Sequence, residues 1–374
     1  MLDTTLVLLC AGESSRFDST SKKQWLRIND LPLWLYVCKK LSSYHDFSKI
    51  IVVSHKDEIS YMKNFSDDCY FVEGGNSRQE SMKNAVENVS TPYVLVSDVA
   101  RSCIPEDVVL RLLNQKGKAD CIVPYLSVSD TVVYKNDTIN RDEVKLIQTP
   151  QLSVTELLKK ALLTTTDFTD DSSAIKNIGG SVSYVKGSIS SNKLTFIEEL
   201  KSISCLQAPT NDIFTGYGID IHPFEQNKKM FLGGVELPYD FGFKAHSDGD
   251  VLIHSIIDAL LGAIGAGDIG EFFPDTDAKY KGADSKELLK HIVNFVKKVG
   301  FEIINIDVSI LAEIPKINPF KNEIKSSLSK LINIDKFKIN IKATTAEKLG
   351  FVGRKEAVTV HSVVAVKYYD WTKK

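Results

Sequence analysis

The sequence predicts an α/β protein in two parts, a doubly wound, Rossmann-like, mostly parallel sheet followed by a smaller α/β domain. Short runs rich in Val, Ile and Leu alternate with longer amphipathic stretches through the first half, an order typical of parallel sheets. Residues 205–212 interrupt this pattern with Pro, Asn and Asp and no hydrophobic periodicity. Because 374 residues suit two domains, we expect one at 1–206 and another at 207–374.

The expected elements follow from hydrophobic periodicity and length. In the first half, strands are predicted at Thr5–Cys10, Lys49–Ser54, Pro92–Ser97 and Asp120–Pro124, with helices near 31–43, 78–88 and 105–114. In the second half, strands are predicted at 218–221, 307–312, 338–342 and 358–367, with helices at 251–264, 285–299 and 320–332. The second domain should therefore combine a four-stranded sheet with helices.

Composition excludes several classes of protein. Hydrophobic residues make up 43% and charged residues 25%, which is typical of soluble globular proteins, and the net charge of -2 gives no basic field for nucleic acid or a membrane surface. The apolar runs are too short to span a bilayer, and the first residues lack a signal-peptide pattern. Six cysteines without a C-x-x-C pair predict free, mostly buried thiols and a cytoplasmic location.

A loop of small residues follows the first predicted strand directly. Residues 10–15 would let the backbone approach phosphate groups, and Arg16 and Lys23 add positive charge. The glycine spacings of the dinucleotide-binding and Walker motifs are both absent. Taken alone, the loop is equally consistent with a strand-to-helix turn that carries solvated charges.

Two further segments point to the same end of the predicted sheet. Gly74 and Gly75 form a second turn that opens a helix, and Asp98 ends a strand, where open α/β sheets keep their ligand crevice. A carboxylate there can hold Mg²⁺ close to phosphates. The alternative for Asp98 is a helix cap or turn residue, which is the commoner use of Asp in a loop.

The second half contains a candidate metal site. Strand alternation sends Asp220 and His222 to one face and predicts that Ile221 is buried on the other, while His254 lies in the helix after 245–251. One carboxylate and two imidazoles suit Zn²⁺ with an open fourth position, although a lone histidine such as His254 is more often a core residue. A glycine-rich loop at 265–277 and a hydroxyl-bearing loop at 343–350 favour a site. The remaining histidines are interpreted as surface or packing residues, namely His45, His55, His291 and His361.

The first half resembles the cytidylyltransferase family of the methylerythritol phosphate route to isoprenoids, over about 1–203. The family motifs A-A-G-x-G-x-R, P-K-Q, G-G-x-x-R-x-x-S and D-A-A-R-P correspond here to 10–16, 22–24, 74–81 and 98–102. Asp130-Thr131, Arg141 before Thr149–Gln151, and Lys193 match later motifs. Three positions depart from the pattern: Ser14 replaces a loop glycine, while Lys22 and Ser102 each replace a proline.

This resemblance implies CTP, accompanied by Mg²⁺ or Mn²⁺, and methylerythritol phosphate as substrates. Arg16 and Lys23 would hold the phosphate oxygens, and Asp98, Arg101 and Lys193 would position the sugar phosphate. Thr131 and Arg141 lie on an arm, about 126–148, that in the family crosses to a partner subunit and implies a dimer. The implied nucleotide contacts are Ala11, Gly12, Gly74, Arg78 and Ser81.

The second half resembles the cyclodiphosphate synthase family of the same route. The motifs G-x-D-x-H, H-S-D-G-D-x-x-x-H, G-D-I-G-x-x-F-P-D-T-D and A-T-T-x-E-K-L-G-F-x-G-R occur in order over 216–368, with Ala346 in place of a frequent threonine. The resemblance implies Zn²⁺ or Mn²⁺ on Asp220, His222 and His254, and Mg²⁺ or Mn²⁺ at Glu347. It also implies a trimer whose sites lie between subunits, with a nucleotide-base pocket at about 311–320.

Roles in that second site follow from the same resemblance. His246 and Ser247 would position the attacking phosphate, Asp268 would bind ribose hydroxyls, and Thr345 and Arg354 would hold phosphate. The other implied substrate contacts are Gly270, Phe273, Asp275, Asp277, Ala312, Lys316, Thr344 and Phe351.

Together the two resemblances imply a bifunctional enzyme that catalyses cytidylyl transfer and cyclisation, two non-consecutive steps. Its partners would be small molecules and further copies of the chain, paired through the first domain and trimeric through the second, which combined would give a hexamer. One alternative is another sugar-phosphate nucleotidyltransferase fused to a metal-dependent phosphohydrolase. A second is a nucleotide-sensing regulator with a structural metal, which would require four protein ligands.

Overall fold

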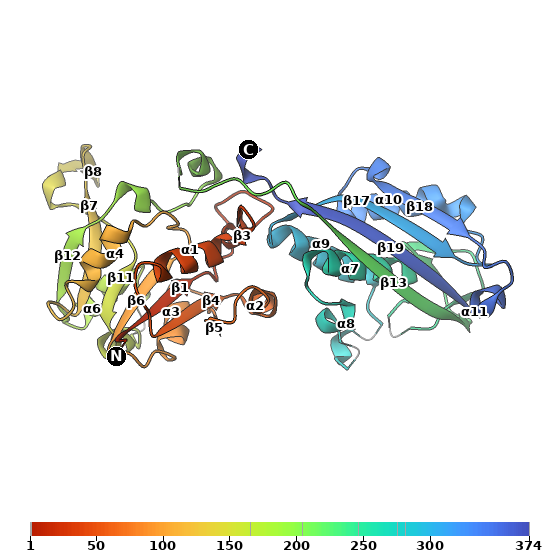
Figure 1. Cartoon of the computed structure of the whole chain (residues 1–374), viewed down its shortest axis with the longest axis horizontal. Coiled ribbons are helices and arrows are strands. Elements are labelled where there is room, and N and C mark those ends of the chain that lie inside the picture. The colour runs from red at the N-terminus through yellow and green to blue at the C-terminus, as the bar shows by residue number, and fades with distance from the viewer. Residues whose placement is uncertain are drawn as a thin grey trace. The chain divides into compact units, whose positions relative to one another are not determined.

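The computed structural model describes residues 2–164, 166–203, 205–245, 247–274, 276–280 and 282–373. The chain forms two compact units, shown in Figure 1. The first comprises the described residues of Met1–Pro209 and Asp370–Lys374, and the second those of Thr210–Tyr369. No helix in the described ranges is long and apolar enough to cross a membrane.

The first unit is built on an eight-stranded sheet. Strand β1 (Thr4–Leu9) lies between β4 (Lys49–Ser54) and β6 (Tyr93–Asp98), and β5 (Cys69–Glu73) pairs with β4, all in parallel. Beyond β6 come β11 (Gln151–Val154), β7 (Cys121–Ser127), β10 (Lys145–Ile147) and β12 (Val182–Lys186). This arrangement confirms the predicted mostly parallel sheet, with β10 and β11 as antiparallel additions.

Helices cover both faces of this sheet. They are α1 (Leu33–Ser42), α2 (Lys56–Lys63), α3 (Arg78–Val86), α4 (Glu106–Leu113), α5 (Thr155–Ala161) and α6 (Asp171–Asn177). Val7 and Leu9 pack into a cluster with Met82 of α3, Leu158 of α5 and Ile175 of α6. The alternate residues Leu6 and Leu8 are also fully buried, as strand alternation requires of a sheet covered on two sides. A two-stranded ribbon, β2 (Arg27–Ile28) and β3 (Leu31–Pro32), precedes α1.

The predicted arm forms a projecting hairpin. Its strands are β8 (Val132–Tyr134) and β9 (Asp137–Ile139), and the chain returns to the sheet at β10. Val133 and Tyr134 are 62% and 60% exposed, which leaves two large apolar side chains without cover in one chain. An apolar surface on a slender projection is typical of a segment that packs against a partner.

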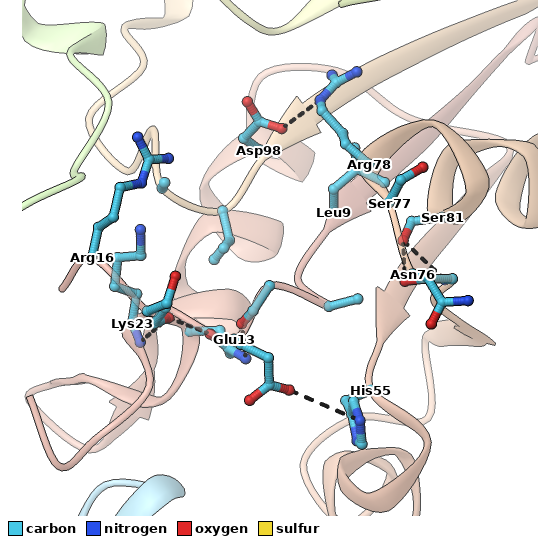
Figure 2. A pocket seen from close by; sticks show the side chains of 18 of the residues that line it. Leu9, Glu13, Arg16, Lys23, His55, Asn76, Ser77, Arg78, Ser81 and Asp98 are labelled. Carbon is cyan, nitrogen blue, oxygen red and sulfur yellow. Dashed lines mark hydrogen bonds and ion pairs between the residues drawn. The ribbon is translucent and has the colours of Figure 1, made fainter. Parts of the chain in front are cut away.

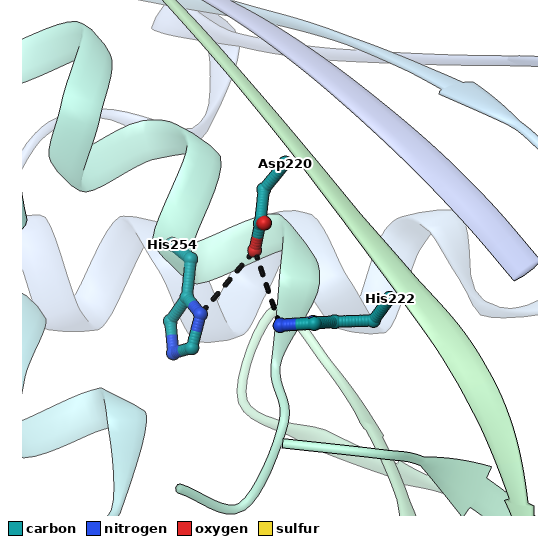
Figure 3. A group of neighbouring side chains, drawn as sticks. All are labelled: Asp220, His222 and His254. Atoms are coloured by element: carbon teal, nitrogen blue, oxygen red, sulfur yellow. Dashed lines mark ion pairs between the residues drawn. The ribbon is translucent and has the colours of Figure 1, made fainter. Parts of the chain in front are cut away.

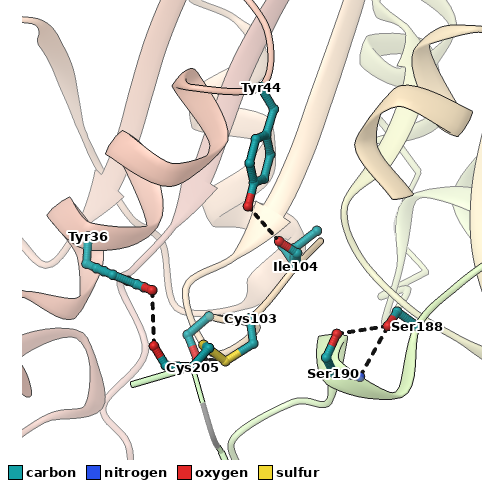
Figure 4. The surroundings of a disulfide bond; sticks show 8 residues. Tyr36, Tyr44, Cys103, Ile104, Ser188, Ser190 and Cys205 are labelled. Carbon is teal, nitrogen blue, oxygen red and sulfur yellow. Dashed lines mark hydrogen bonds between the residues drawn. A yellow bond between two sulfur atoms is a disulfide. The ribbon is translucent and has the colours of Figure 1, made fainter. Parts of the chain in front are cut away.

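Two cysteines of the first unit form a disulfide, Cys103 with Cys205, with Cα atoms 5.9 Å apart (Figure 4). The prediction of six free thiols is therefore wrong for this pair. The partners are 102 residues apart in sequence, so only the folded chain brings them together. The prediction of free thiols is confirmed for Cys10, Cys38 and Cys121, which are buried, and for Cys69, which is half-buried.

The second unit contains a five-stranded sheet in the order β16-β13-β19-β17-β18. The strands are β13 (Ile213–Gln226), β16 (Phe241–Phe243), β17 (Phe301–Leu311), β18 (Ile339–Thr344) and β19 (Ala357–Tyr368), with β14 (Met230–Leu232) and β15 (Val235–Leu237) as a separate hairpin. Four strands were predicted, and the fifth is the short β16, which pairs with the end of β13. The helices are α7 (Val251–Ile264), α8 (Ile269–Phe272), α9 (Ser285–Lys298), α10 (Lys321–Ile332) and α11 (Gly350–Gly353).

Helix α7 lies unusually close to β13 because two glycines face it. A Cβ atom at Gly216 would lie 1.9 Å from the carbonyl oxygen of Ala259, and one at Gly218 would lie 2.0 Å from that of Ser255. Only glycine permits such an approach. The opposite face of β13 is uncovered in one chain, so Ile221, predicted to be buried, is instead 45% exposed.

The last described residues return to the first unit. Trp371 is 6% exposed, and its indole Nε1 donates to the backbone oxygen of Arg27 at 2.7 Å. Nothing in the sequence signals this return, because a five-residue segment carries no periodicity. The first unit is therefore assembled from both ends of the described chain.

Candidate active sites

A cavity of about 590 Å³ lies in the first unit at the carboxyl ends of the parallel strands (Figure 2). Its wall includes Leu9 at the end of β1, His55 directly after β4, and Asp98 at the end of β6. This is the crevice that open α/β sheets offer to ligands. The cavity brings together eight of the predicted residues: Ala11, Gly12, Arg16, Lys23, Arg78, Ser81, Asp98 and Lys193.

Four cationic side chains line this cavity, those of Arg16, Lys23, Arg78 and Lys193. Burial lowers the pKa of Lys23, and the positive charges of Lys193 and Arg16 lower it further. The ammonium of Lys23 donates to the backbone oxygen of Leu194 at 3.1 Å, directly after Lys193 in the chain. Mutual repulsion among cations in a partly buried cavity is relieved by an anion, so the cavity is suited to phosphate groups.

Asp98 is the anionic centre of the opposite wall. It accepts from Arg78 Nε at 3.3 Å and from Lys193 Nζ at 3.2 Å. Burial alone would raise the pKa of Asp98, but the charges of Arg78 and Lys193 outweigh it and the pKa is lowered. Arg78 also donates to the fully buried Asp171 at 3.1 Å, whose pKa is raised to about 6 by burial. Asp98 is thus held ionised by fixed cations.

The loop after β1 keeps a glycine-like path despite Ser14. This residue has a φ of 56°, the left-handed conformation that a glycine would adopt easily. Its hydroxyl accepts from the backbone N–H of Lys23 at 3.1 Å. The serine therefore ties the loop to the turn that carries Lys23. Gly74 supports the same loop from the other side, since a Cβ there would lie 2.4 Å from that of Ala11.

Four other predicted residues do not line the cavity of a single chain, namely Gly74, Arg101, Thr131 and Arg141. Arg101 donates to the backbone oxygens of Ser191 at 2.7 Å and Ile147 at 3.4 Å, while its neighbour Ala100 lines the wall. Thr131 and Arg141 are exposed on the arm. Arg141 donates to Ser129 within the arm, so its position in one chain is local.

Sequence reasoning missed several wall residues. His55 was interpreted as a surface or packing residue, but it lines the cavity, with Nε2 3.9 Å from Glu13 Oε1. The signal was available, because His55 follows a strand directly, as Asp98 ends one. The other wall residues that were not named as candidates are Leu9, Glu13, Ser14, Ser15, Gln24, Gly75, Asn76, Ser77, Val99 and Ala100.

The predicted metal triad is assembled in the second unit (Figure 3). Asp220 Oδ2 lies 3.3 Å from His254 Nδ1 and 3.6 Å from His222 Nε2, and the three ligand atoms are within 4.8 Å of one another. The strand β13 supplies Asp220 and His222 on one face, and α7 brings His254 against that face. The carboxylate is fixed by the N–H of Ile221, which donates to Oδ1 at 2.8 Å.

A layer of hydroxyls orients His254. Its Nε2 lies 3.0 Å from Ser285 Oγ and 3.2 Å from Ser247 Oγ, which leaves Nδ1 directed at Asp220. Ser285 in turn donates to Asp248 at 2.5 Å. Burial disfavours the protonated form of both imidazoles. In His222 burial prevails, and the pKa is lowered. In His254 the hydrogen bond and charge of Asp220 outweigh burial, and the pKa is raised.

The residues present suit a cation. Asp220 Oδ2 is a buried atom with no hydrogen-bond partner, and this anionic oxygen faces two imidazole nitrogens, His222 Nε2 and His254 Nδ1. A carboxylate and two imidazoles are zinc ligands in their chemistry and number.

Sequence reasoning did not single out Asp258, which lies one turn after His254 on α7. Its carboxylate accepts from the backbone N–H of Ile269 at 2.9 Å, and burial raises its pKa.

A second group of predicted residues lies across the sheet. Ile221 of β13 pairs with Thr359 of β19, which pairs with Leu311 of β17, which pairs with Thr344 of β18. Three strand spacings of about 4.8 Å put Thr344 about 14 Å from the metal strand. Thr344 is followed by Thr345, whose hydroxyl donates to Glu347 at 2.6 Å. The other members of this group are Ala312, Lys316, Phe351 and Arg354, the last paired with Glu356 at 2.8 Å.

The loop after α7 contains the remaining predictions. Asp268 caps α8 by accepting from Glu271 N at 3.1 Å, Gly270 lies within α8, and Phe273 is buried behind it. Asp277 is exposed. Predictions for His246 and Asp275 fall outside the described residues.

Fold and sites define a two-part enzyme, with a cation-lined nucleotide-type crevice in one unit and a three-ligand metal site in the other. Residues 4–206 match the family model of 2-C-methyl-D-erythritol 4-phosphate cytidylyltransferase, and residues 213–367 match the YgbB family. "Bifunctional enzyme IspD/IspF" of Aliarcobacter butzleri is 62% identical over the full length of both chains. That of Sulfurimonas denitrificans is 53% identical, over 99% of this chain and 95% of the relative. The solved structure of bifunctional IspDF from Campylobacter jejuni superposes with a TM-score of 0.88, at 49% identity over 99% of this chain and 100% of the other.

The chain belongs to the family of bifunctional IspD/IspF enzymes. It is a cytidylyltransferase joined to a cyclodiphosphate synthase of the methylerythritol phosphate route to isoprenoids. Both predicted resemblances are confirmed, and the alternative of a different nucleotidyltransferase fused to a phosphohydrolase is not supported.

Proposed function

We propose that the cavity of the first unit carries cytidylyl transfer and that the triad of the second carries cyclisation. In the first reaction, a phosphate oxygen of methylerythritol phosphate attacks the α-phosphorus of CTP, and pyrophosphate leaves. The observation that carries this assignment is the grouping of Arg16, Lys23 and Lys193 around one cavity, where burial and mutual repulsion lower the pKa of Lys23. Such a site stabilises the negative charge that grows on the phosphoryl oxygens.

Different residues of this cavity hold different parts of the two substrates. Arg16 and Lys23 hold the oxygens of the α-phosphate, while Asp98, with Lys193 and Arg101 beside it, positions the sugar phosphate. CTP would bring Mg²⁺ or Mn²⁺, for which Asp98 offers a carboxylate oxygen. Ala11, Gly12, Gly74, Arg78 and Ser81 shape and hold the wall that faces the nucleotide.

In the second reaction, the 2-phosphate of the CDP-methylerythritol substrate attacks the β-phosphorus, and CMP leaves. Asp220, His222 and His254 would hold Zn²⁺ or Mn²⁺, which as a Lewis acid would polarise the β-phosphate. Ser247 and Ser285 keep the Nδ1 atom of His254 turned towards Asp220. Glu347 would hold Mg²⁺ or Mn²⁺, which would neutralise negative charge on the diphosphate, and Thr345 orients its carboxylate.

We also propose that the enzyme works as a homo-oligomer in the cytoplasm, the compartment of CTP and sugar phosphates. Thr344 and Glu347 lie across the sheet from the triad, so a complete cyclase site requires the edge of a second copy. The uncovered apolar face of β13 suits a trimer, and the exposed arm suits a dimer of the first unit. These contacts together would build a hexamer.

Two single substitutions, one in each site, test which reaction each site carries. Lys23→Ala should lower the turnover of cytidylyl transfer by about 100- to 1000-fold and leave cyclisation unchanged, because only the first cavity loses a cation. His254→Ala should lose bound zinc, measured by elemental analysis, together with cyclisation, and leave transfer unchanged. Full zinc occupancy in His254→Ala, or equal losses of both activities in Lys23→Ala, would contradict the assignment.

A further inference from the structure

The turn that carries Lys23 is held from inside the protein by one buried carboxylate. Lys23 begins a short 3₁₀ turn, Lys23–Trp25, and Glu58 of α2 lies behind it with only 4% of its surface exposed. Glu58 does not line the cavity. Its carboxylate is therefore available to the turn and not to a substrate.

Glu58 accepts hydrogen bonds from the residues on both sides of Lys23. Lys22 Nζ donates to Oε1 at 2.7 Å, and Trp25 Nε1 donates to Oε2 at 2.6 Å. Gln24 Nε2 also lies 3.3 Å from Oε2. These three contacts, with residues 22, 24 and 25, fix the backbone that carries Lys23, while its own side chain lines the cavity.

The same contacts extend to the phosphate loop. Lys22 Nζ donates a second time, to Glu13 Oε1 at 2.8 Å, and Gln24 Nε2 donates to the backbone oxygen of Gly12 at 3.3 Å. Glu13 and Gly12 both line the cavity. Removing the charge of Glu58 would thus loosen the lysine turn and the loop opposite it together.

Glu58 is itself rigidly placed. Its helix α2 also supplies Tyr61, whose ring stacks on that of Trp25 with centroids 5.2 Å apart, and Trp25 is fully buried. Burial alone would lower the pKa of Lys22, but Glu58 and Glu13 outweigh it and raise that pKa. Breaking a buried ion pair on one side leaves an uncompensated charge, so this pair resists rearrangement.

We propose that Glu58 is a positioning residue for cytidylyl transfer, which acts through Lys22, Gln24 and Trp25 to hold Lys23 at the transferred phosphoryl group. It explains why a lysine is accepted at position 22, where the family motif has proline. Lys22 has a φ of −69°, close to the angle that a proline ring imposes, so the backbone angle expected of the motif is kept. The proposal rests on the role proposed above for Lys23.

The test uses Glu58→Gln in the full chain, with turnover and KM for CTP measured well below the unfolding temperature. The amide is nearly isosteric and can still accept from Trp25, but it loses the charge that holds Lys22. We expect the turnover of transfer to fall by about 100-fold, the cost of a misplacement of about 1 Å, with KM for CTP changed less than about threefold. Cyclisation should be unchanged and serves as the internal control.

Glu156→Gln is the matched control. It breaks an ion pair of similar length in the same unit, with Lys159 at 2.9 Å, but on an exposed helix surface. Its turnover should equal that of the unchanged enzyme. If Glu58→Gln does not fold, Lys22→Met removes the other half of the pair and should lower turnover in the same way.

A double-mutant cycle separates positioning from general stability. In a Lys23→Ala background, Glu58→Gln should lower turnover less than about threefold further, because its effect passes through Lys23. Losses that multiply, or a Glu58→Gln enzyme with full turnover, would overturn the proposal. Full turnover in Lys23→Ala alone would instead overturn the role of Lys23, so the two failures are distinguishable.

Discussion

At the scale of single residues, Ser14 shows how a side chain can occupy a glycine position and make use of it. Its φ of 56° costs roughly 1 kcal/mol relative to glycine, but its hydroxyl binds the N–H of Lys23 at 3.1 Å. The expected backbone path survives because this hydrogen bond offsets the strain. Departures from a motif are therefore informative when the structure shows what the new side chain contacts.

The lowered pKa of Lys23 leads to a pH prediction. Only the ammonium form of Lys23 stabilises phosphoryl oxygens, so turnover should decline as rising pH deprotonates it. The midpoint of this decline should lie below 10.5, the ordinary pKa of lysine. Burial and the charges of Lys193 and Arg16 cause the lowering. In Lys193→Met, one repelling charge is gone, so the midpoint of the alkaline decline should move to higher pH although turnover is lower. A pH–rate profile of transfer measures this, and an unchanged midpoint would contradict it.

Residue types at the sites were predictable, but their partners were not. Motif spacing and strand alternation predicted Asp98, Lys23 and the metal triad as candidates, and the structure brings the first two to one cavity and the triad into one cluster. These patterns did not identify Asp171 or Glu58, which reach Arg78 and Lys22 over 93 and 36 residues. Contacts of this kind depend on tertiary packing, for which a single sequence has no periodic signal.

At the scale of elements, the metal site depends on how closely one strand and one helix approach. Gly216 and Gly218 allow β13 to contact α7, and this contact sets the separation of Asp220 from His254. The periodicity of α7 was clear in the sequence, and its predicted bounds agree with Val251–Ile264. The uncovered face of β13 could not be predicted, because alternation shows which residues share a face but not whether anything covers it.

Gly218→Ala should damage the cyclase unit through this contact. The new Cβ would lie 2.0 Å from Ser255 O and 2.7 Å from Ala259 N, both backbone atoms, so α7 must move away. We expect about 1–3 kcal/mol of destabilisation and weaker zinc binding, measured by thermal unfolding and metal titration. Gly262→Ala is the matched control on the same helix; its Cβ meets nothing within 4 Å, and it should stabilise by up to about 1 kcal/mol. Equal effects of the two variants would refute the packing argument.

At the scale of the whole molecule, the units do not follow each other simply along the chain. The first unit includes residues before 210 and after 369. The sequence predicted a linker near 205–212 from its composition, and the units do part at Pro209 and Thr210. The disulfide and the returning tail both bring distant segments together, which composition does not reveal.

Trp371→Ala should therefore affect the transferase unit, although it lies beyond the cyclase residues. Loss of a buried indole and its hydrogen bond to Arg27 O should destabilise that unit by about 3 kcal/mol. Calorimetry can assign the lowered transition, because CTP with Mg²⁺ should raise it and leave the other transition in place. Thr372→Ala, an exposed neighbour, should change neither transition. A shift confined to the cyclase transition would contradict this view of the tail.

The returning tail has a consequence for synthesis on the ribosome. Domains generally fold as units as they emerge, N-terminal first. Here the transferase unit emerges first but lacks Trp371 until all of residues 210–369 have been translated. Its nascent form therefore has a gap where the indole will pack, throughout the time that the ribosome needs for the second unit. A chain released within the cyclase would contain a transferase unit without this indole, which we expect to be less stable by about 3 kcal/mol.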